Sequence, residues 1–261
     1  MRSTLGGIVI ILLSCFGIAY GEPPEGNPNG LSLDAQRCPA STDWQFLVAP
    51  YAWLSAVSTD LTTDKESISA DATFSDIWNV LDFAGFVHAE ASQGKWGIFT
   101  DIIYIKLSQS TDVRVPKTLI RLSADATLKE SIVELGGMRT FQGKRTALDV
   151  LAGARRFVFD SDLNIGPINR EIKKNWIDPF VGGRIRCKLS EKWDTSLRVD
   201  LGGFGAGSDL TLNATALVDY NLSDSTVLGI GYRYFDVDYS GEKADLDMTT
   251  YGPILGVGFR F

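Results

Sequence analysis

The chain has 261 residues, of which 44% are hydrophobic and 22% charged, with 26 glycines and a formal net charge of −7. This acidic balance excludes a general nucleic-acid-binding protein, because phosphate contacts need clustered Lys and Arg. The composition suits an ordinary globular protein, and equally a barrel with an apolar outside and a polar inside.

The first 21 residues have the features of a secretory signal peptide. Arg2 supplies a positive charge, an apolar run extends to Tyr20, and Ala19 and Gly21 give the small-x-small pattern that precedes cleavage. A second interpretation stays open, because "LLSC" resembles a lipoprotein signal in which Cys15 carries the lipid. Both predict export. No later stretch reaches the ~20 consecutive apolar residues that a spanning helix needs.

Residues 22–43 are rich in Pro, Gly and Asn and have no periodicity, which predicts a flexible periplasmic leader before a single domain at 44–261. Export would leave Cys38 and Cys187 in a compartment that permits disulfides. Two interpretations remain: a bridge between these residues, or two separate thiols, with Cys187 on the apolar face of a strand.

From Trp44 onward, apolar residues alternate with polar or small ones at a period of two, which predicts β-strands. In "NWIDPFVGGRIRCKL", for example, Ile177, Val181 and Ile185 share one face, while Asp178 and Arg184 share the other. One exception is "FSDIWNVL" at 74–81, which suggests a helical turn. Ten strands are predicted, at 44–57, 83–93, 95–108, 122–141, 145–160, 174–190, 192–204, 209–222, 225–239 and 247–261.

The connections between these strands alternate in length. Tight turns are predicted at 94, 142–144, 191 and 223–225, and longer connections at 58–82, 109–121, 161–173, 205–208 and 240–246. An antiparallel meander places all tight turns at one end, the pattern of outer-membrane barrels with short periplasmic turns and longer extracellular loops. The predicted fold is therefore all-β, a single transmembrane antiparallel up-and-down barrel of about ten strands. The number of strands has one alternative, since residues 66–73 could extend a hairpin above the membrane.

The last segment, "YGPILGVGFRF", ends the chain within an alternating strand. A sheet in hydrocarbon must close on itself, because no water satisfies a free strand edge there. The last strand is therefore expected to pair with the first, and Pro50 and Pro253 both lie beside this closure, where a break in the ladder is tolerated. Aromatic residues cluster near the strand ends, as interfacial girdles do: Trp96, Tyr104, Trp193, Tyr220, Tyr232, Tyr234, Phe259 and Phe261.

The segments "PYAWL", "LDFAGFVHAE", "KWGIFTDIIY", "GYRYFDVDY" and "GPILGVGFRF" resemble a family of small bacterial outer-membrane barrels of unassigned role. The family is broadly similar to the OmpA-type and opacity-type porin-like barrels, and the likeness covers Trp44 to Phe261. The resemblance implies a Gram-negative outer-membrane location, with lipid as the environment and with periplasmic chaperones and the barrel-assembly machinery as partners in transit. It assigns the assembly signal to the terminal Phe261.

If the apolar faces contact lipid, the charged residues of the other faces point inward. Seven acidic and seven basic residues balance one another there, and an unpaired charge in a barrel this narrow would be costly. An interior salt-bridge network with at most a thin water path is therefore expected. Its members are Glu90, Asp101, Glu134, Asp149, Asp178, Asp200, Asp219, Arg155, Arg184, Arg186, Lys188, Arg198, Arg233 and Arg260.

The sequence predicts no catalytic, cofactor-binding or metal site. Its one histidine, His88, lies near a periplasmic turn, whereas the ten-stranded omptin proteases carry theirs at the outer rim; His88 is expected to pair with Glu90. The expected role is structural, at the cell surface, or limited porin-like diffusion. Two alternatives remain: a narrow channel with a mild anion preference from Arg184, Arg186 and Lys188, and a soluble ligand-binding β-barrel.

Overall fold

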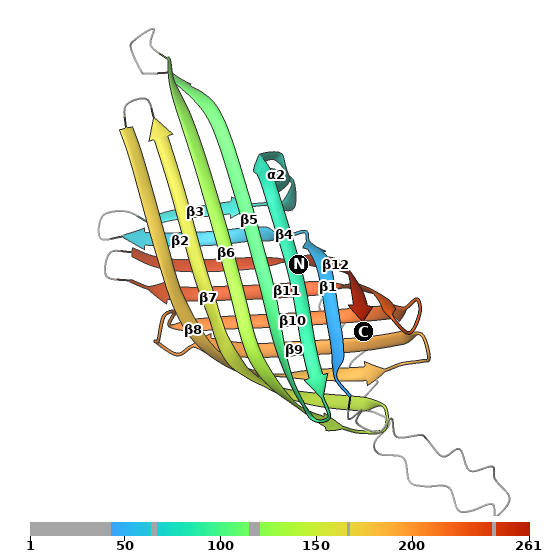
Figure 1. Ribbon diagram of the computed structural model, residues 1–261. Coiled ribbons are helices and arrows are strands. Elements are labelled where there is room, and N and C mark those ends of the chain that lie inside the picture. The colour runs from blue at the N-terminus through green and yellow to red at the C-terminus, as the bar shows by residue number, and fades with distance from the viewer. Residues whose placement is uncertain (1–42, 64–66, 115–120, 166–167, 242–243) are drawn as a thin grey trace, which may run out of the picture.

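The computed structural model describes residues 43–63, 67–114, 121–165, 168–241 and 244–261. The segments predicted to be a signal peptide and a leader, with Cys15 and Cys38, fall on residues that the structure does not describe, so those predictions stay predictions. Within them the protein is almost entirely β-structure (Figure 1).

Ten antiparallel strands form a closed ring, because β12 pairs both with β11 and with β1. The predicted all-β, ten-strand barrel is confirmed. The ring strands are β1 (Gln45–Trp53), β4 (Leu81–Gln93), β5 (Trp96–Arg114), β6 (Arg121–Gln142), β7 (Thr146–Ile165), β8 (Ile168–Lys188), β9 (Trp193–Gly203), β10 (Leu210–Asn221), β11 (Thr226–Ser240) and β12 (Ala244–Arg260).

The predicted first strand is divided into two. It is interrupted at Leu54 and Ser55, and its continuation β2 (Ala56–Thr63) pairs with residues 244–251 of β12. Strand β3 (Ser67–Ala72) then pairs with β2, so the described part of the segment predicted to extend a hairpin does so. The expected helical turn is α2 (Phe74–Val80), which leads into β4. Neither α2 nor any other helix in the described part of the chain is long and apolar enough to cross a bilayer.

The two ends of the barrel differ. The tight turns 94–95, 143–145, 189–192 and 222–225 all lie at one end, called here the turn end, and the opposite end is called the hairpin end. At the hairpin end the strands run further than predicted: Arg114 pairs with Arg121 and Ile165 with Ile168, across segments expected to be loops. Figure 1 shows these two hairpins projecting beyond the other strands.

The seam between the first and last strands involves the chain terminus itself. Phe261 N–H donates to Phe46 O at 3.0 Å, and Phe46 N–H donates to Phe261 O at 3.2 Å. The β1–β12 register runs through Leu47 and Val48 and resumes at Tyr51, so it skips Pro50, which has no N–H to give. The expected closure of the sheet is confirmed.

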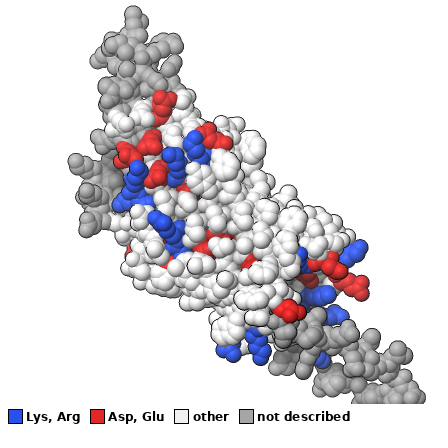
Figure 2. Space-filling view, in the orientation of Figure 1, with Lys and Arg blue, Asp and Glu red and all other residues white. Residues whose placement is uncertain are grey.

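The outward face of the barrel is apolar around its middle. Figure 2 shows charged side chains concentrated toward the two ends of one face, with a largely uncharged band between them. Exposed apolar side chains occur on strands all round the ring, among them Phe46, Ile98, Leu135, Val150, Ile177, Val181, Val199, Leu201, Ile230 and Leu255. In a closed sheet with a filled interior, such a belt needs an apolar solvent, which lipid tails provide.

The interior is apolar toward the hairpin end, whereas the sequence predicted only charged interior residues. Phe157, Trp176 and Phe235 stack there, with ring centroids of Phe157 and Trp176 4.9 Å apart. Below this layer, β7 approaches β6 and the ring of Phe180 too closely for a side chain at Gly153: a Cβ there would lie 2.3 Å from Leu135 O and 2.8 Å from Phe180 Cζ. The buried members of this apolar layer are Trp53, Phe86, Ile103, Ile132, Phe157, Trp176, Phe235, Val237, Met248 and Ile254.

Candidate functional site

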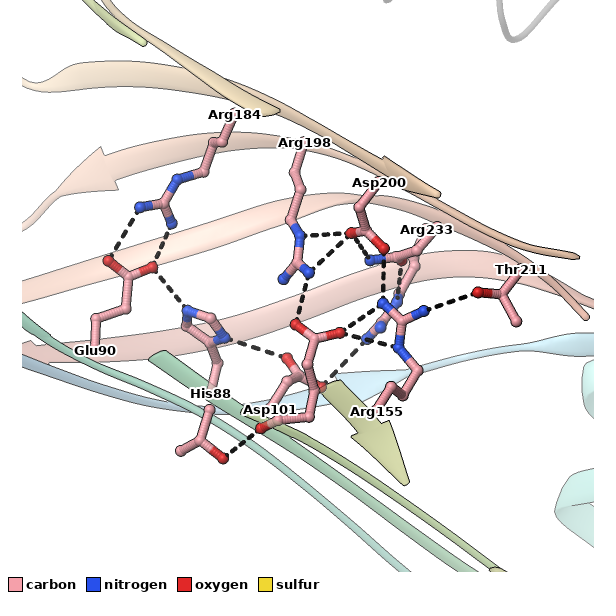
Figure 3. A network of polar contacts seen from close by, with 12 residues as sticks. His88, Glu90, Asp101, Arg155, Arg184, Arg198, Asp200, Thr211 and Arg233 are labelled. Atoms are coloured by element: carbon pink, nitrogen blue, oxygen red, sulfur yellow. Dashed lines mark hydrogen bonds and ion pairs between the residues drawn. The ribbon is translucent and has the colours of Figure 1, made fainter. Parts of the chain in front are cut away.

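The first polar cluster inside the barrel centres on Asp149 of β7, which is fully buried. Arg184 Nε donates to Asp149 Oδ2 at 2.8 Å, and Arg186 Nη2 donates to Oδ1 at 2.9 Å. Thr140 Oγ1 adds a third hydrogen bond at 2.7 Å. Arg184 also pairs with Glu90 of β4 across the lumen, as Figure 3 shows. Glu90 and Asp149 therefore neutralise the two arginines between them.

His88 extends this cluster toward a second one. Its Nε2 lies 2.8 Å from Glu90 Oε1, and its Nδ1 lies 3.2 Å from Asp101 Oδ2. Asp101 also accepts a hydrogen bond from Tyr51 Oη at 2.8 Å and faces Arg233 Nη1 at 3.4 Å. The expected pairing of His88 with Glu90 is present, and a second carboxylate holds the other ring nitrogen.

The second cluster lies deeper in the barrel, where two carboxylates share two guanidinium groups. Arg155 Nη2 contacts Glu134 Oε2 at 2.6 Å and Asp200 Oδ1 at 2.7 Å. Arg198 Nη2 contacts Glu134 Oε1 at 2.6 Å, and its Nε contacts Asp200 Oδ2 at 2.8 Å. The registers explain the arrangement, because Glu134 lies opposite Arg155 on the neighbouring strand, and Asp200 follows Arg198 by two residues.

Aromatic rings pack against these cations. The Arg155 guanidinium carbon lies 5.0 Å from the ring centroid of Phe180 and 4.9 Å from that of Phe235. Arg198 lies 5.0 Å from the centroid of Phe99. Guanidinium groups tolerate such stacking because their faces are weakly hydrated. The rings therefore exclude water from the ion pairs and join the polar layer to the apolar layer.

Asp178 is placed inside the barrel but makes no contact with a cation in the described residues. Its Oδ1 accepts from the backbone N–H of Ser208 at 2.7 Å, and Trp176 Nε1 donates to Ser208 Oγ at 2.8 Å. The connection 204–209 is thus drawn inward against β8. Its tight path uses positive φ at Gly203, Phe204 and Gly205. Asp178 anchors a loop rather than an ion pair.

A cavity of about 1230 Å³ opens at the turn end. Its inner wall is formed by the polar network, including Glu90, Arg184 and Arg198. Lys188, Asp219 and Arg260 line its mouth instead of joining the network, and Arg260 Nη1 donates to Asn221 Oδ1 at 2.7 Å. The Arg186 side chain is 43% exposed to this space.

Of the fourteen interior residues predicted from the sequence, ten meet in ion pairs, five carboxylates with five arginines. The remaining four are Asp178, Lys188, Asp219 and Arg260. The prediction missed the uncharged members, of which Asn213 bridges Asp200 and Arg233 by hydrogen bonds of 2.8 and 2.9 Å. Thr140, Thr211 and Tyr51 were missed as well. Each lies on the polar face of its strand, and this alternation could have identified it.

Both ring nitrogens of His88 are engaged by carboxylates, on the turn-end side of the interior. Among the described residues, no group of three or more His, Cys, Asp or Glu side chains is arranged to hold a metal ion.

No protein-family model and no curated protein matches the sequence. Among solved structures, the chain is similar to the attachment invasion locus protein Ail of Yersinia pestis, with 11% identity and a TM-score of 0.37 over 84% of this chain and 99% of that one. It is similar to the outer-membrane protease OmpT of Escherichia coli, with 10% identity and a TM-score of 0.46 over 87% and 100%. The translocator domain of the autotransporter NalP of Neisseria meningitidis gives 12% identity and a TM-score of 0.37 over 83% and 88%.

The architecture itself is defined by the chain's own geometry. Ten antiparallel strands close without an edge, the tight turns all lie at one end, and the exposed belt is apolar. These are the features that a hydrocarbon environment imposes on a sheet. The protein is an integral β-barrel of the outer-membrane type.

Proposed function

We propose that the protein is a sealed barrel of the bacterial outer membrane, with a structural role or a role at the cell surface. Its lumen would not conduct freely. The supporting observation is that charged and aromatic side chains from opposite walls meet in the middle of the barrel and are almost fully buried there.

The seal has two layers. Arg155 and Asp149 are 0% exposed, and so is Phe157 in the apolar layer above them. A water-filled pore would leave some face of these side chains accessible, as the wide lumens of sixteen-stranded porins do. The desolvation cost of burying Arg155 and Asp149 is offset by the ion pairs and hydrogen bonds that each makes to its partners.

The route to the membrane belongs to the same proposal. The first 21 residues would direct export and be removed, and periplasmic chaperones and the barrel-assembly machinery would receive the chain. Phe261 would serve as the assembly signal. The turn end, where Gln45 and Phe261 lie, would then face the periplasm, and the long hairpins would face outward.

Planar-bilayer recording of the purified, refolded protein tests the seal. We expect no lasting open-channel conductance from the wild type. An Arg155→Ala variant removes a fully buried side chain from the middle of the barrel, and we expect it to admit transient ion flux. Large, stable conductance of the wild-type protein would refute the sealed interior.

A narrow anion-preferring channel is the second candidate, favoured by the cavity at the turn end and by Arg184, Arg186 and Lys188 around it. This candidate requires an ion flux in the wild type that changes in selectivity when Arg184 and Arg186 are replaced by Gln. The paired carboxylates Glu90 and Asp149 argue against a strong preference.

The third candidate, a soluble ligand-binding barrel, predicts that the mature protein stays in solution without detergent. The exposed apolar belt of the barrel disfavours a soluble protein. Membrane fractionation combined with heat-modifiable gel mobility separates the two cases, because a folded membrane barrel stays with the outer membrane and migrates differently before heating.

A further inference from the structure

Four charged residues form one row on the outward face of the barrel near the hairpin end. The ladders pair Lys106 of β5 with Lys129 of β6, Lys129 with Asp160 of β7, and Asp160 with Lys173 of β8. Three of the four are lysines. Lys106 and Lys129 lie directly opposite one another, an arrangement of like charges that destabilises a sheet unless an anion compensates it.

Two of the lysines already have carboxylate partners. Lys106 Nζ lies 2.8 Å from Asp82 Oδ2, and Lys173 pairs with Glu171. Lys129 has no ion pair within the part of the chain that the structure describes. Asp160 lies opposite Lys129 in the register but forms no ion pair with it, so Lys129 is the lysine of this row without a bound carboxylate among the described residues.

Arg156 lies below this row on the same wall. It is exposed and sits between Val133 of β6 and Ile177 of β8, which are themselves 39% and 57% exposed. No ion pair or ring contact is formed by Arg156 among the described side chains. An arginine on the lipid-facing side of a barrel is destabilising at the bilayer midplane and much less so near the interface. Its side chain should therefore extend toward the nearer headgroups.

The height of the row can be measured from the other interface. At the turn end, Trp96 is exposed and Arg139 stacks on it at 5.2 Å, as an interfacial pair would. Lys106 is ten residues further along β5. At ~3.3 Å per residue and a tilt of ~40°, this is ~25 Å along the membrane normal, the height of a barrel's apolar band. The lysine row therefore lies where hydrocarbon gives way to headgroups.

We propose that Lys129 and Arg156 form a phosphate-binding site for a phosphorylated glycolipid of the outer leaflet, with Lys106 at its edge. The inference rests on the orientation given under Proposed function, in which the hairpin end faces outward. Lipid phosphates at this boundary supply an anion for Lys129 and Arg156, which form no ion pair with the described side chains.

The spacing fits one phosphate group between two cations. Arg156 and the row above it are four residues apart along β7, or ~13 Å. Extended Arg and Lys side chains reach ~6–7 Å each, so their charged ends can approach the same phosphate from below and above. Ser131 lies between these levels on β6, two residues from Lys129, and offers a hydroxyl donor.

The opposite wall has the reverse character. At the hairpin end of β2, β12 and β11, the residues in register are Asp60, Asp247 and Asp238. This acidic row would repel a phosphate. Glycolipid binding should therefore be confined to the β5–β8 wall, with a defined stoichiometry rather than a complete annulus.

The test measures how much diphosphorylated lipid A the refolded barrel retains, using native mass spectrometry in detergent. We compare the wild type with a Lys129→Gln/Arg156→Gln double variant and with an Arg156→Gln single variant. The matched control is Lys144→Gln/Arg145→Gln, which removes the same charge from the other end of the same β6–β7 hairpin. Heat-modifiable mobility verifies that each variant is folded.

We expect the wild type and the turn variant to bind equally, and the double variant to bind about tenfold more weakly or worse, because two charge-assisted contacts are lost. Dephosphorylated lipid A should bind weakly to all of them. Equal retention by the double variant, or equal binding of dephosphorylated lipid A, overturns the proposal.

Two competitors distinguish the source of the phosphate. The glycolipid assignment would be overturned if phosphatidylglycerol, added at the same concentration as lipid A, displaced lipid A from the wild type. Displacement of lipid A by millimolar inorganic phosphate would overturn it as well. The result is separable from the conductance test, because a conducting barrel that retains lipid A contradicts only the sealed interior.

Discussion

Arg155 shows how a single residue holds the interior together. Its guanidinium joins Glu134 to Asp200 and lies between the rings of Phe180 and Phe235, with no exposed surface. Removing one partner of a buried ion pair leaves a desolvated charge, which costs more than the pair itself contributes. Arg198 remains beside both carboxylates but cannot neutralise two of them alone.

We therefore expect Arg155→Met to lower the free energy of unfolding by about 3–5 kcal/mol. Urea unfolding of the barrel in lipid vesicles, followed by the loss of heat-modifiable mobility, measures the change. The matched control is Arg186→Gln: the Arg186 side chain is 43% exposed, and Asp149 keeps Arg184 when it is lost. A solvent-screened pair of this kind contributes at most about 1 kcal/mol. Equal losses in the two variants would contradict the account of the network.

At the scale of single elements, α2 is the one helix in the part of the chain that the structure describes, and it depends on local contacts. Asp76 Oδ2 accepts the backbone N–H of Thr73 at 2.9 Å, and Thr73 Oγ1 accepts the N–H of Asp76, which completes a capping box. No residue of α2 is buried, and the rings of Phe74 and Trp78 pack against each other, 5.7 Å apart. A seven-residue helix without a buried face needs its cap.

Thr73→Ala should therefore open α2, with amide exchange of residues 74–80 about fivefold faster by mass spectrometry, the factor that corresponds to a typical cap. Asn79→Ala is the control, since it leaves the cap intact and places a better helix former in the interior. Unchanged exchange in Thr73→Ala would show that the cap does not hold the helix.

The same cap should respond to acid. Hydrogen bonds from Thr73 lower the pKa of Asp76 below its ordinary value of 3.8. The ionised carboxylate is therefore the form that stabilises α2, and its contribution is present above the unfolded-state pKa and lost as the pH falls through the lowered folded-state pKa. Exchange in α2, corrected for intrinsic rates, should accelerate only under strongly acidic conditions.

On the scale of the whole molecule, closure depends on the last residues of the chain. Phe261 and Phe46 exchange two backbone hydrogen bonds, and Arg260 and Phe259 pair with Leu47 and Val48. Every other ring strand has two neighbours whatever happens at the terminus. The β1–β12 ladder closes the ring at the turn end, while β2 covers the rest of the β12 edge. Loss of the β1–β12 ladder therefore leaves β1 and the last residues of β12 with a free edge in hydrocarbon.

Deleting residues 259–261 should lower the fraction that refolds into lipid vesicles, because each lost backbone bond contributes about 1 kcal/mol net. Phe261→Ala keeps the backbone bonds and should refold in vesicles like the wild type. If Phe261 is also the assembly signal, the same substitution should reduce the amount of protein in outer-membrane fractions of cells. A normal level there would limit Phe261 to its structural role.

The sequence by itself determined the class of fold. A period of two over ten segments fixes which side chains share a face, and the alternation of turn lengths places all tight turns at one end, because both follow from backbone geometry alone. The same alternation selected Glu134, Arg155 and Asp200 as inward charges. It also carries the signal for Phe157 and Phe235, which lie two residues beyond Arg155 and Arg233 and therefore point inward too.

Only the tertiary structure decided which of these residues meet. Partners such as Glu90 and Arg184 are 94 positions apart in sequence and touch across the lumen, a relation set by the stagger of the closed ring and not by any local pattern. The same stagger puts Asp178 beside the loop at Ser208, and leaves Lys188, Asp219 and Arg260 at the cavity mouth. A strand's own sequence fixes the direction of a side chain, whereas the barrel's shear and diameter fix what lies opposite to it.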